Sequence, residues 1–137
     1  MRIKLMVGVG IAVASIAAPA WAHHAFAAEF DAKTPIHLEG TLTKVELINP
    51  HSWIHVDVTG PDGKVTSWMV EAGSPNVLLR RGFNKNTIPV GTKVVVDGYQ
   101  SKDGSLRANG RAITLPNGQK LFLGSSGTGA PYDKDQK

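Results

Sequence analysis

Five histidines give this chain its clearest capacity for chemistry, and they are His23, His24, His37, His51 and His55. The adjacent pair His23 and His24 attracts most interest, because a free amino terminus at His23 would place an amine beside two imidazole rings. Nitrogen donors of this kind suit Cu(II) or Ni(II). The pair predicts a transition-metal site with Cu(II) as its cofactor if the chain is cleaved just before His23. The alternative is a polar start without a role.

The first residues have the three parts of a secretory signal peptide. A basic start precedes an apolar run over residues 5–18, which is followed by small residues at Ala20 and Ala22. This run is shorter than the roughly 20 residues that cross a bilayer. We expect residues 1–22 to be removed, leaving a periplasmic or secreted chain that begins at His23 and has no membrane span.

A second pair of small residues, Ala25 and Ala27, offers a later cleavage site after Ala27. Cleavage there would discard both His23 and His24 and would end the metal hypothesis. The earlier site is favoured because it follows the apolar run directly.

Composition narrows the class of partner. After removal of the signal peptide the chain has 13 basic and 11 acidic residues, and a charge of +2 is too small to indicate nucleic acid. There is no cysteine, which excludes disulfides, thiolate metal sites and thiol nucleophiles. The sequence also has no glycine-rich phosphate loop. We expect a non-enzymatic protein whose partner is a small ligand or another envelope protein.

His51 and His55 have the spacing of a helical zinc pair, but the residues around them predict a strand. Four residues of strand span about 13 Å, whereas bonds from zinc to its ligands are about 2 Å. The two rings therefore cannot hold one ion in extended geometry. We expect His51 to form hydrogen bonds within the corner made by Asn49 and Pro50.

Residues 52–59 alternate between apolar and mixed side chains, which predicts a strand with one buried face. The buried face is expected to hold Ile54, Val56 and Val58. The candidate ligand-binding residues on the opposite face are Trp53, His55, Asp57 and, on the next strand, Glu71. An exposed tryptophan beside histidine and glutamate would make a recognition surface. The alternative is that Trp53 packs as part of the core.

Turn signals divide the rest of the chain into short strands and one helix. The expected strands cover about residues 36–48, 52–59, 64–72, 92–100 and 107–115, with a short last strand at 120–123. A cap at Ser74, Pro75 at the first helical position and Gly82 at the end predict a helix between the third and fourth strands. This order favours a mostly β chain with a five-stranded OB-like barrel over a sandwich.

These elements predict four parts of the chain: a signal peptide at 1–22, an amino-terminal arm at 23–34, the OB-like barrel at 35–124 and a tail at 125–137. Pro35 is expected to close the arm. Gly40 is expected to mark a bulge or a sharp bend. The tail is small, polar and charged, so it is expected to be disordered with nothing to bury.

Several short motifs carry a resemblance to a known family. They are His23-His24-Ala25-Phe26, Asn49-Pro50-His51-Ser52-Trp53, Gly73-Ser74-Pro75-Asn76, Leu79-Arg80-Arg81-Gly82 and Asp97-Gly98-Tyr99. With them the chain resembles a family of small exported bacterial proteins known as a domain of unknown function. The resemblance implies a bacterial extracytoplasmic protein and supplies no functional residues.

The leading interpretation is a non-enzymatic binding protein of the cell envelope. The first alternative is a copper-binding protein that uses His23 and His24. A third interpretation is a structural or interaction module that meets another protein through its sheet edge or through the face that carries Trp53.

Overall fold

The computed structural model describes residues 25–124 and 128–136, so the predicted signal peptide, His23 and His24 lie outside the described residues. The elements are α1 (Ala25–Glu29), β1 (Phe30–Glu46), β2 (Ser52–Thr59), β3 (Val65–Ala72), α2 (Pro75–Arg80), β4 (Lys93–Ser101), β5 (Arg107–Thr114), β6 (Lys120–Phe122) and η2 (Pro131–Gln136). The chain is mostly β, as the sequence predicts. None of the helices in the described ranges is long and apolar enough to cross a membrane.

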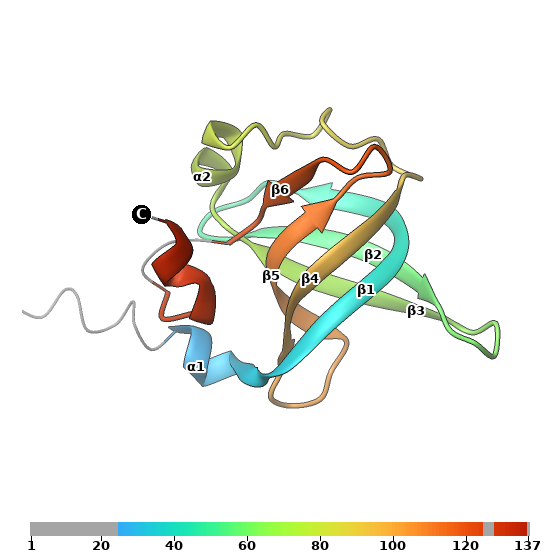
Figure 1. Cartoon of the computed structure of the whole chain (residues 1–137), viewed down its shortest axis with the longest axis horizontal. Coiled ribbons are helices and arrows are strands. Elements are labelled where there is room, and N and C mark those ends of the chain that lie inside the picture. The colour runs from blue at the N-terminus through green and yellow to red at the C-terminus, as the bar shows by residue number, and fades with distance from the viewer. Residues whose placement is uncertain (1–24, 125–127, 137) are drawn as a thin grey trace, which may run out of the picture.

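The six strands form one curled sheet in the order β3-β2-β1-β4-β5-β6 (Figure 1). Neighbouring strands in this order run antiparallel. β3 also pairs with β5 in parallel, with Met69 opposite Arg107 and Glu71 opposite Asn109. The pairings from β3 through β2, β1 and β4 to β5 therefore return to β3. This return brings the end of β3 beside the start of β5, where the candidate site lies.

The main core lies inside the curled sheet and confirms the predicted buried face of β2. Ile54 and Val56 are 0% exposed, and Val58 is partly buried against the same core. Burying aliphatic side chains such as these stabilises the fold by about 1.5–3 kcal/mol each. The opposite face of β2 carries Trp53, His55 and Asp57 at half-buried positions.

The predicted helix between β3 and β4 is present as α2. The Ser74 hydroxyl accepts a hydrogen bond from the Val77 amide at 3.4 Å, and Pro75 opens the helix. Gly82 follows with a φ of +83°, a conformation that costs glycine little. Leu78 is fully buried and fixes the helix over the core.

β1 differs from the expectation that Pro35 ends the arm, because the strand starts at Phe30 and continues through Pro35. The proline lies in the part of β1 that pairs with β4, before the pairing with β2 begins at Thr41. The missing amide of Pro35 therefore faces no second strand, and a proline is tolerated at such an edge.

Gly40 permits a close approach of two strands and is not the site of the bulge. A Cβ atom at Gly40 would lie 2.4 Å from the Asp57 carbonyl oxygen, so the backbones of β1 and β2 lie too close here to leave room for a side chain. The register shift of β1 against β2 instead falls between Leu42 and Lys44.

The prediction that the tail has nothing to bury is wrong for Ala130 and Tyr132. These two residues form a second small core with Phe26 and Phe30, while Tyr99 and Phe122 pack against it. Tyr132 packs directly against Gly124, where a Cβ atom would lie 2.3 Å from the tyrosine ring and would prevent this contact. The arm and the carboxyl-terminal segment thus cover each other's apolar surface, and α1 and η2 lie side by side at one end of the molecule (Figure 1).

Candidate functional site

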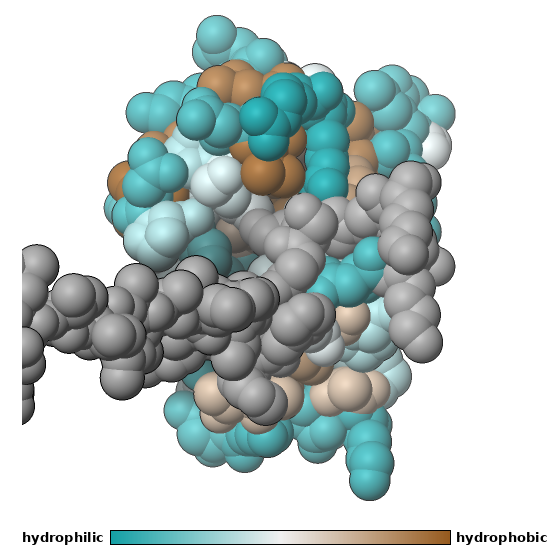
Figure 2. Space-filling view, turned by 90° about the vertical axis from the view of Figure 1, so that its left-hand side faces the viewer, coloured by the Kyte–Doolittle hydropathy of each residue, from teal (hydrophilic) through white to brown (hydrophobic). Residues whose placement is uncertain are grey.

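A small cavity of about 50 Å³ lies at this end, where α1, the β1–β2 connection, β3 and β5 meet. Its lining consists of Phe26, Glu29, Phe30, His51, Glu71, Asn109 and Thr128. Figure 2 views this end of the molecule, where most of the coloured surface is hydrophilic and the hydrophobic residues form small separate groups. The cavity combines an imidazole, two carboxylates and an amide with aromatic walls. Organic ligands need pockets of about 300–1,000 Å³, so this cavity has room only for an ion or a few waters.

His51 and Glu71 form the central polar pair of the cavity. The His51 Nδ1 atom lies 3.0 Å from the Glu71 Oε1 atom, and the Glu71 side chain is only 13% exposed. Burial raises the pKa of the Glu71 carboxyl, and the nearby Glu29 raises it further, while His51 and Arg107 act in the opposite direction. The other ring nitrogen, His51 Nε2, forms no hydrogen bond with any residue that the structure describes. This pair therefore presents one unpaired nitrogen backed by a carboxylate.

Arg107 connects Trp53 to the rim of this cavity. Its guanidinium lies 5.3 Å from the centre of the Trp53 ring and 3.4 Å from the Glu29 carboxylate. A cation over an aromatic face is a favourable arrangement, and it occupies a face of the ring that a ligand would stack on. Trp53 therefore supports Arg107 with one face of its ring, and its role in binding a ligand stays a prediction.

The base of the cavity is held by Asn109 and the second small core. The Tyr132 hydroxyl donates a hydrogen bond to the Asn109 side-chain oxygen, and both residues are buried. Burial raises the pKa of Tyr132, so its hydroxyl keeps the proton that it donates. Tyr132 also packs against Phe122 with ring centres 5.4 Å apart. The carboxyl-terminal segment thus fixes the amide that faces Glu71 across the β3–β5 pairing.

The four predicted ligand-binding residues share the outer face of β2 and β3 but do not form one site. Trp53 lies opposite Glu71 in the strand register, close to the cavity. His55 instead bonds Glu46 on β1 at 2.7 Å. Asp57 accepts a hydrogen bond from Ser67 at 2.7 Å, further along the hairpin. The structure therefore places Trp53 and Glu71 in one region, apart from His55 and Asp57.

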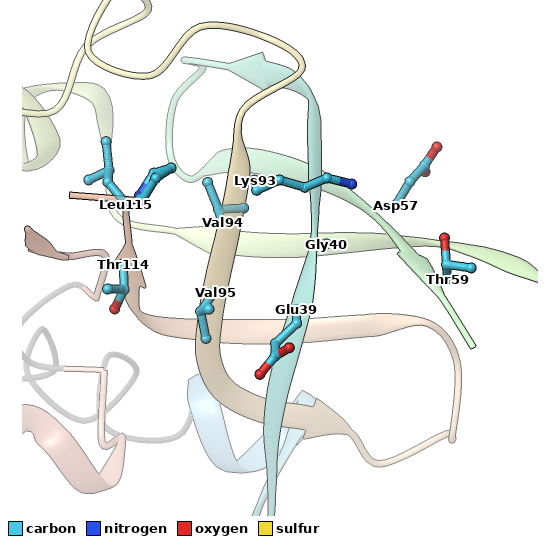
Figure 3. A pocket seen from close by; sticks show the side chains of 10 residues that line it. Glu39, Gly40, Asp57, Thr59, Lys93, Val94, Val95, Thr114 and Leu115 are labelled. Carbon is cyan, nitrogen blue, oxygen red and sulfur yellow. The ribbon is translucent and has the colours of Figure 1, made fainter. Parts of the chain in front are cut away.

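Asp57 belongs to a second hollow, an open groove of about 380 Å³ beside Gly40. Figure 3 shows the Lys93 side chain extending across β1 toward the strand that carries Asp57. The Lys93 amine donates to the Thr41 hydroxyl at 2.8 Å, and Asp57 is held by Ser67. These polar groups of the groove already have local partners, so the groove has weaker features of a binding site despite its size.

The described residues contain no preformed cluster of three or more histidine, aspartate or glutamate side chains that would hold a metal ion. The predicted metal ligands His23 and His24 lie outside the described residues. His51 was expected to support the Asn49–Pro50 corner, and the structure instead pairs it with Glu71. His51 and His55 have separate carboxylate partners, Glu71 and Glu46.

A family model matches residues 11–111, which is well over half of the chain. The chain belongs to DUF6152, a family of unknown function. The DUF6152 match includes His51, Glu71 and Arg107, and it ends within β5. The segment around Thr128 and Tyr132 that closes the cavity lies beyond the matched range. A search of curated proteins found no match.

Sequence reasoning missed Glu29, Asn109 and Tyr132 as parts of this site. Asn109 had a detectable signal, because it is a polar residue between two small residues in a predicted strand. Tyr132 was the one aromatic residue in a tail judged too polar to pack. Glu29 and Arg107 are 78 residues apart and come together because β1 and β5 both pair with β4, which local patterns do not encode.

Proposed function

We propose that this chain is an exported, non-enzymatic binding protein of the cell envelope, and that its ligand is a cation held at the cavity of His51 and Glu71. The observation that carries the proposal is the pairing of His51 Nδ1 with a carboxylate in a cavity only about 50 Å³ in volume. Histidines that bind metals commonly have a carboxylate on their second ring nitrogen, which orients the ring. His51 then offers its Nε2 atom to the ion.

The proposal includes an OB-like barrel as the scaffold. Its support is the parallel pairing of β3 with β5 and the position of α2 between β3 and β4. OB-folds bind ligands over strands 2 and 3 and the loops between strands 1 and 2 and between strands 4 and 5. His51 lies on the β1–β2 connection, Glu71 on β3 and Arg107 at the start of β5. These positions support the proposal, because they correspond to the loops and strands over which OB-folds bind ligands.

A binding role is favoured over catalysis by the size of the cavity. A volume of about 50 Å³ leaves no space for an organic substrate beside His51 and Glu71. Export to the periplasm or beyond is proposed from the signal-like residues 1–22. Amino-terminal sequencing of protein from the extracytoplasmic fraction tests this part, with a first residue of His23 expected and an intact Met1 contradicting it.

The cation is tested by metal analysis and native mass spectrometry of protein purified from its native envelope. We expect one first-row transition metal per chain, lost on treatment with EDTA and lost in a His51→Ala variant. The matched control is His37→Ala, since His37 also pairs with a carboxylate, Asp97, but lies away from the cavity. A chain that carries no metal and gains none on titration would contradict the proposal.

A further inference from the structure

We infer that two copies of this chain pair through the free edge of β3, with residues 65–68 of one copy antiparallel to the same residues of the other. The partner is therefore a second copy of this chain, joined by backbone hydrogen bonds. The inference goes beyond the proposed cation, because residues 65–68 do not line its cavity.

The first half of β3 has a neighbouring strand on one side only. β2 pairs with β3 along its whole length, whereas β5 pairs only with residues 69–71. β1 pairs with β2 no further than Asp57, so the end of the β2–β3 hairpin extends beyond the rest of the sheet (Figure 1). Within the described ranges, β2 is thus the only strand that pairs with residues 65–68.

The backbone of this edge presents hydrogen-bonding groups without a partner. The Met69 amide points away from β2, because it donates to the Leu106 carbonyl at 3.0 Å. In an antiparallel ladder, the residues that direct their amide and carbonyl to one side alternate with those that direct them to the other. The groups of Val65 and Ser67 therefore also point away from β2, and they bond to no residue that the structure describes. The edge thus offers two donors and two acceptors.

Two other free edges of the sheet have features that prevent pairing with another chain. Charged residues, proline and short length protect an exposed edge. Residues 30–40 of β1, which pair with β4 but not with β2, include Pro35 and Glu39. β6 has only three residues and begins with Lys120. Residues 65–68 have no charge and no proline, and the first three are exposed. This edge therefore lacks the usual protection and suits a partner strand.

Pairing with a second copy uses all the free groups of the edge. In an antiparallel pair centred on Thr66, Val65 lies opposite Ser67 of the second copy, and the two residues exchange two hydrogen bonds. A two-fold axis repeats this arrangement, which makes four bonds in all. Both donors and both acceptors of each copy are then satisfied.

The side chains around this axis also suit an identical partner. On the outer face, Val65 is 58% exposed and Met69 is 36% exposed, and the pairing makes them diagonal neighbours between the copies. On the other face, Lys64 comes to lie opposite Trp68 of the second copy, where a cation and an aromatic ring attract each other. The Lys64 side chains of the two copies lie at opposite ends of the pairing, so they do not repel.

The contact is small, which sets the expected strength. Standard interfaces involve about 20–30 residues on each side, whereas this one centres on a single short edge. We therefore expect a reversible dimer, and the mass measured by sedimentation velocity should rise with protein concentration.

The first test is sedimentation velocity of the purified protein, Val65→Lys, Val65→Pro and the control Val90→Lys. Val65→Lys brings like charges together across the axis, and Val65→Pro removes an outward amide at the first position of β3, where proline is tolerated. Val90 is 68% exposed and lies outside the strands. We expect self-association to be weaker by at least about tenfold in both Val65 variants and unchanged in the control. Circular dichroism should show that all four proteins are folded.

The second test uses the absence of cysteine from the chain, which lets one introduced cysteine report the register. Thr66 of each copy lies at the axis in a non-hydrogen-bonded pair, with Cα atoms about 4.5 Å apart, which a disulfide can join. Thr59, opposite Val65 in the hairpin, lies on the strand away from the axis. In oxidised glutathione, Thr66→Cys should form a disulfide-linked dimer at least about tenfold faster than Thr59→Cys.

Three outcomes would overturn the inference. One is a protein that stays monomeric at every concentration. Another is a dimer that persists unchanged in Val65→Lys and Val65→Pro, because it must use a different surface. Equal rates of disulfide formation from Thr66→Cys and Thr59→Cys would exclude the register centred on Thr66. The cation site is tested separately by metal analysis, so failure of the dimer leaves that proposal standing.

Discussion

The molecule has a large groove and a small cavity, and the polar groups of the large groove are the more completely paired. The groove beside Gly40 has about 380 Å³, yet Lys93 and Asp57 on its lining bond to neighbouring side chains on the sheet. The cavity of His51 and Glu71 has about 50 Å³, yet it contains a nearly buried carboxylate and an imidazole nitrogen without a described partner. Buried polar groups that remain incompletely paired are costly, and in this pair Glu71 is 13% exposed and His51 is 36% exposed. The pairing of polar groups therefore indicates the site better than volume does.

The largest loss of stability should come from a substitution that unfolds the domain and so abolishes both the groove and the cavity. Val56 is 0% exposed on the inner face of β2, the strand that carries residues of both regions on its outer face. Val56→Asp would bury an unpaired carboxylate at a cost of several kcal/mol, against a total stability of about 5–15 kcal/mol. We expect loss of the folded state by circular dichroism.

The control is Thr59→Asp at the exposed end of the same strand, which should fold normally. An unchanged melting temperature for Val56→Asp would mean that the inner and outer faces of β2 are assigned the wrong way round.

The second prediction changes the surroundings of the cavity and leaves the groove intact. Tyr132→Ala removes a buried ring from the second small core, for which an aromatic-to-alanine change costs about 3–5 kcal/mol. Tyr132→Phe removes only the hydrogen bond to the buried Asn109, at a cost of about 1–3 kcal/mol. We expect both losses in urea unfolding, with alanine the larger. Equal stability of Tyr132→Ala and the unchanged protein would show that the tail does not contribute to folding.

How well the sequence predicts each region follows from how local its interactions are. The buried face of β2 and the cap of α2 follow from alternation and from Ser74, Pro75 and Gly82, and both are observed. These features depend on residues that are close along the chain. The position of Asp57 opposite Ser67 likewise depends on two strands that are neighbours along the chain, β2 and β3.

The cavity could not be predicted in the same way, because its parts come from both ends of the chain. Glu29 contacts Arg107 because β1 and β5 both pair with β4, and Phe26 contacts Thr128, about a hundred residues further along the chain. Tyr132 looked solvent-exposed because its neighbours are polar, and only the apolar arm gives it a place to pack. Long-range contacts of this kind leave no periodic signal in the sequence.

The third prediction alters only the groove. Gly40→Ala would place a Cβ atom 2.4 Å from the Asp57 carbonyl oxygen, so the backbones of β1 and β2 must separate. We expect a loss of about 1–3 kcal/mol, the usual cost of overpacking. The control is Glu39→Ala, since Glu39 lines the same groove at an exposed position. This substitution should change the free energy of unfolding by less than about 0.5 kcal/mol.

Metal titration of Gly40→Ala then tests whether the regions are independent. The affinity of the cavity for the metal ion should stay unchanged, since His51 and Glu71 do not take part in the close approach of β1 and β2 at Gly40. A parallel loss of affinity would mean that the two hollows are mechanically coupled.

The smallest expected effect concerns His37, whose carboxylate pairing resembles that of His51 but lies outside both hollows. The hydrogen bond from His37 Nδ1 to Asp97 at 2.6 Å, together with the charge of Asp97, raises the pKa of His37 above its ordinary value of 6.5, and Glu39 adds a smaller increase. A raised pKa in the folded state means that the pair stabilises the protein below pH 6.5 and that this contribution disappears as the pH rises through the raised pKa.

Asp97→Asn should therefore lower the pKa of His37 in an NMR titration more than Glu39→Gln does, because Asp97 supplies the larger effect. Melting temperatures of the Asp97→Asn variant and the unchanged protein should differ below pH 6.5 and converge at higher pH. Equal shifts in the two variants would show that the cross-strand hydrogen bond is not formed in solution, and would remove His37 as a matched control for His51.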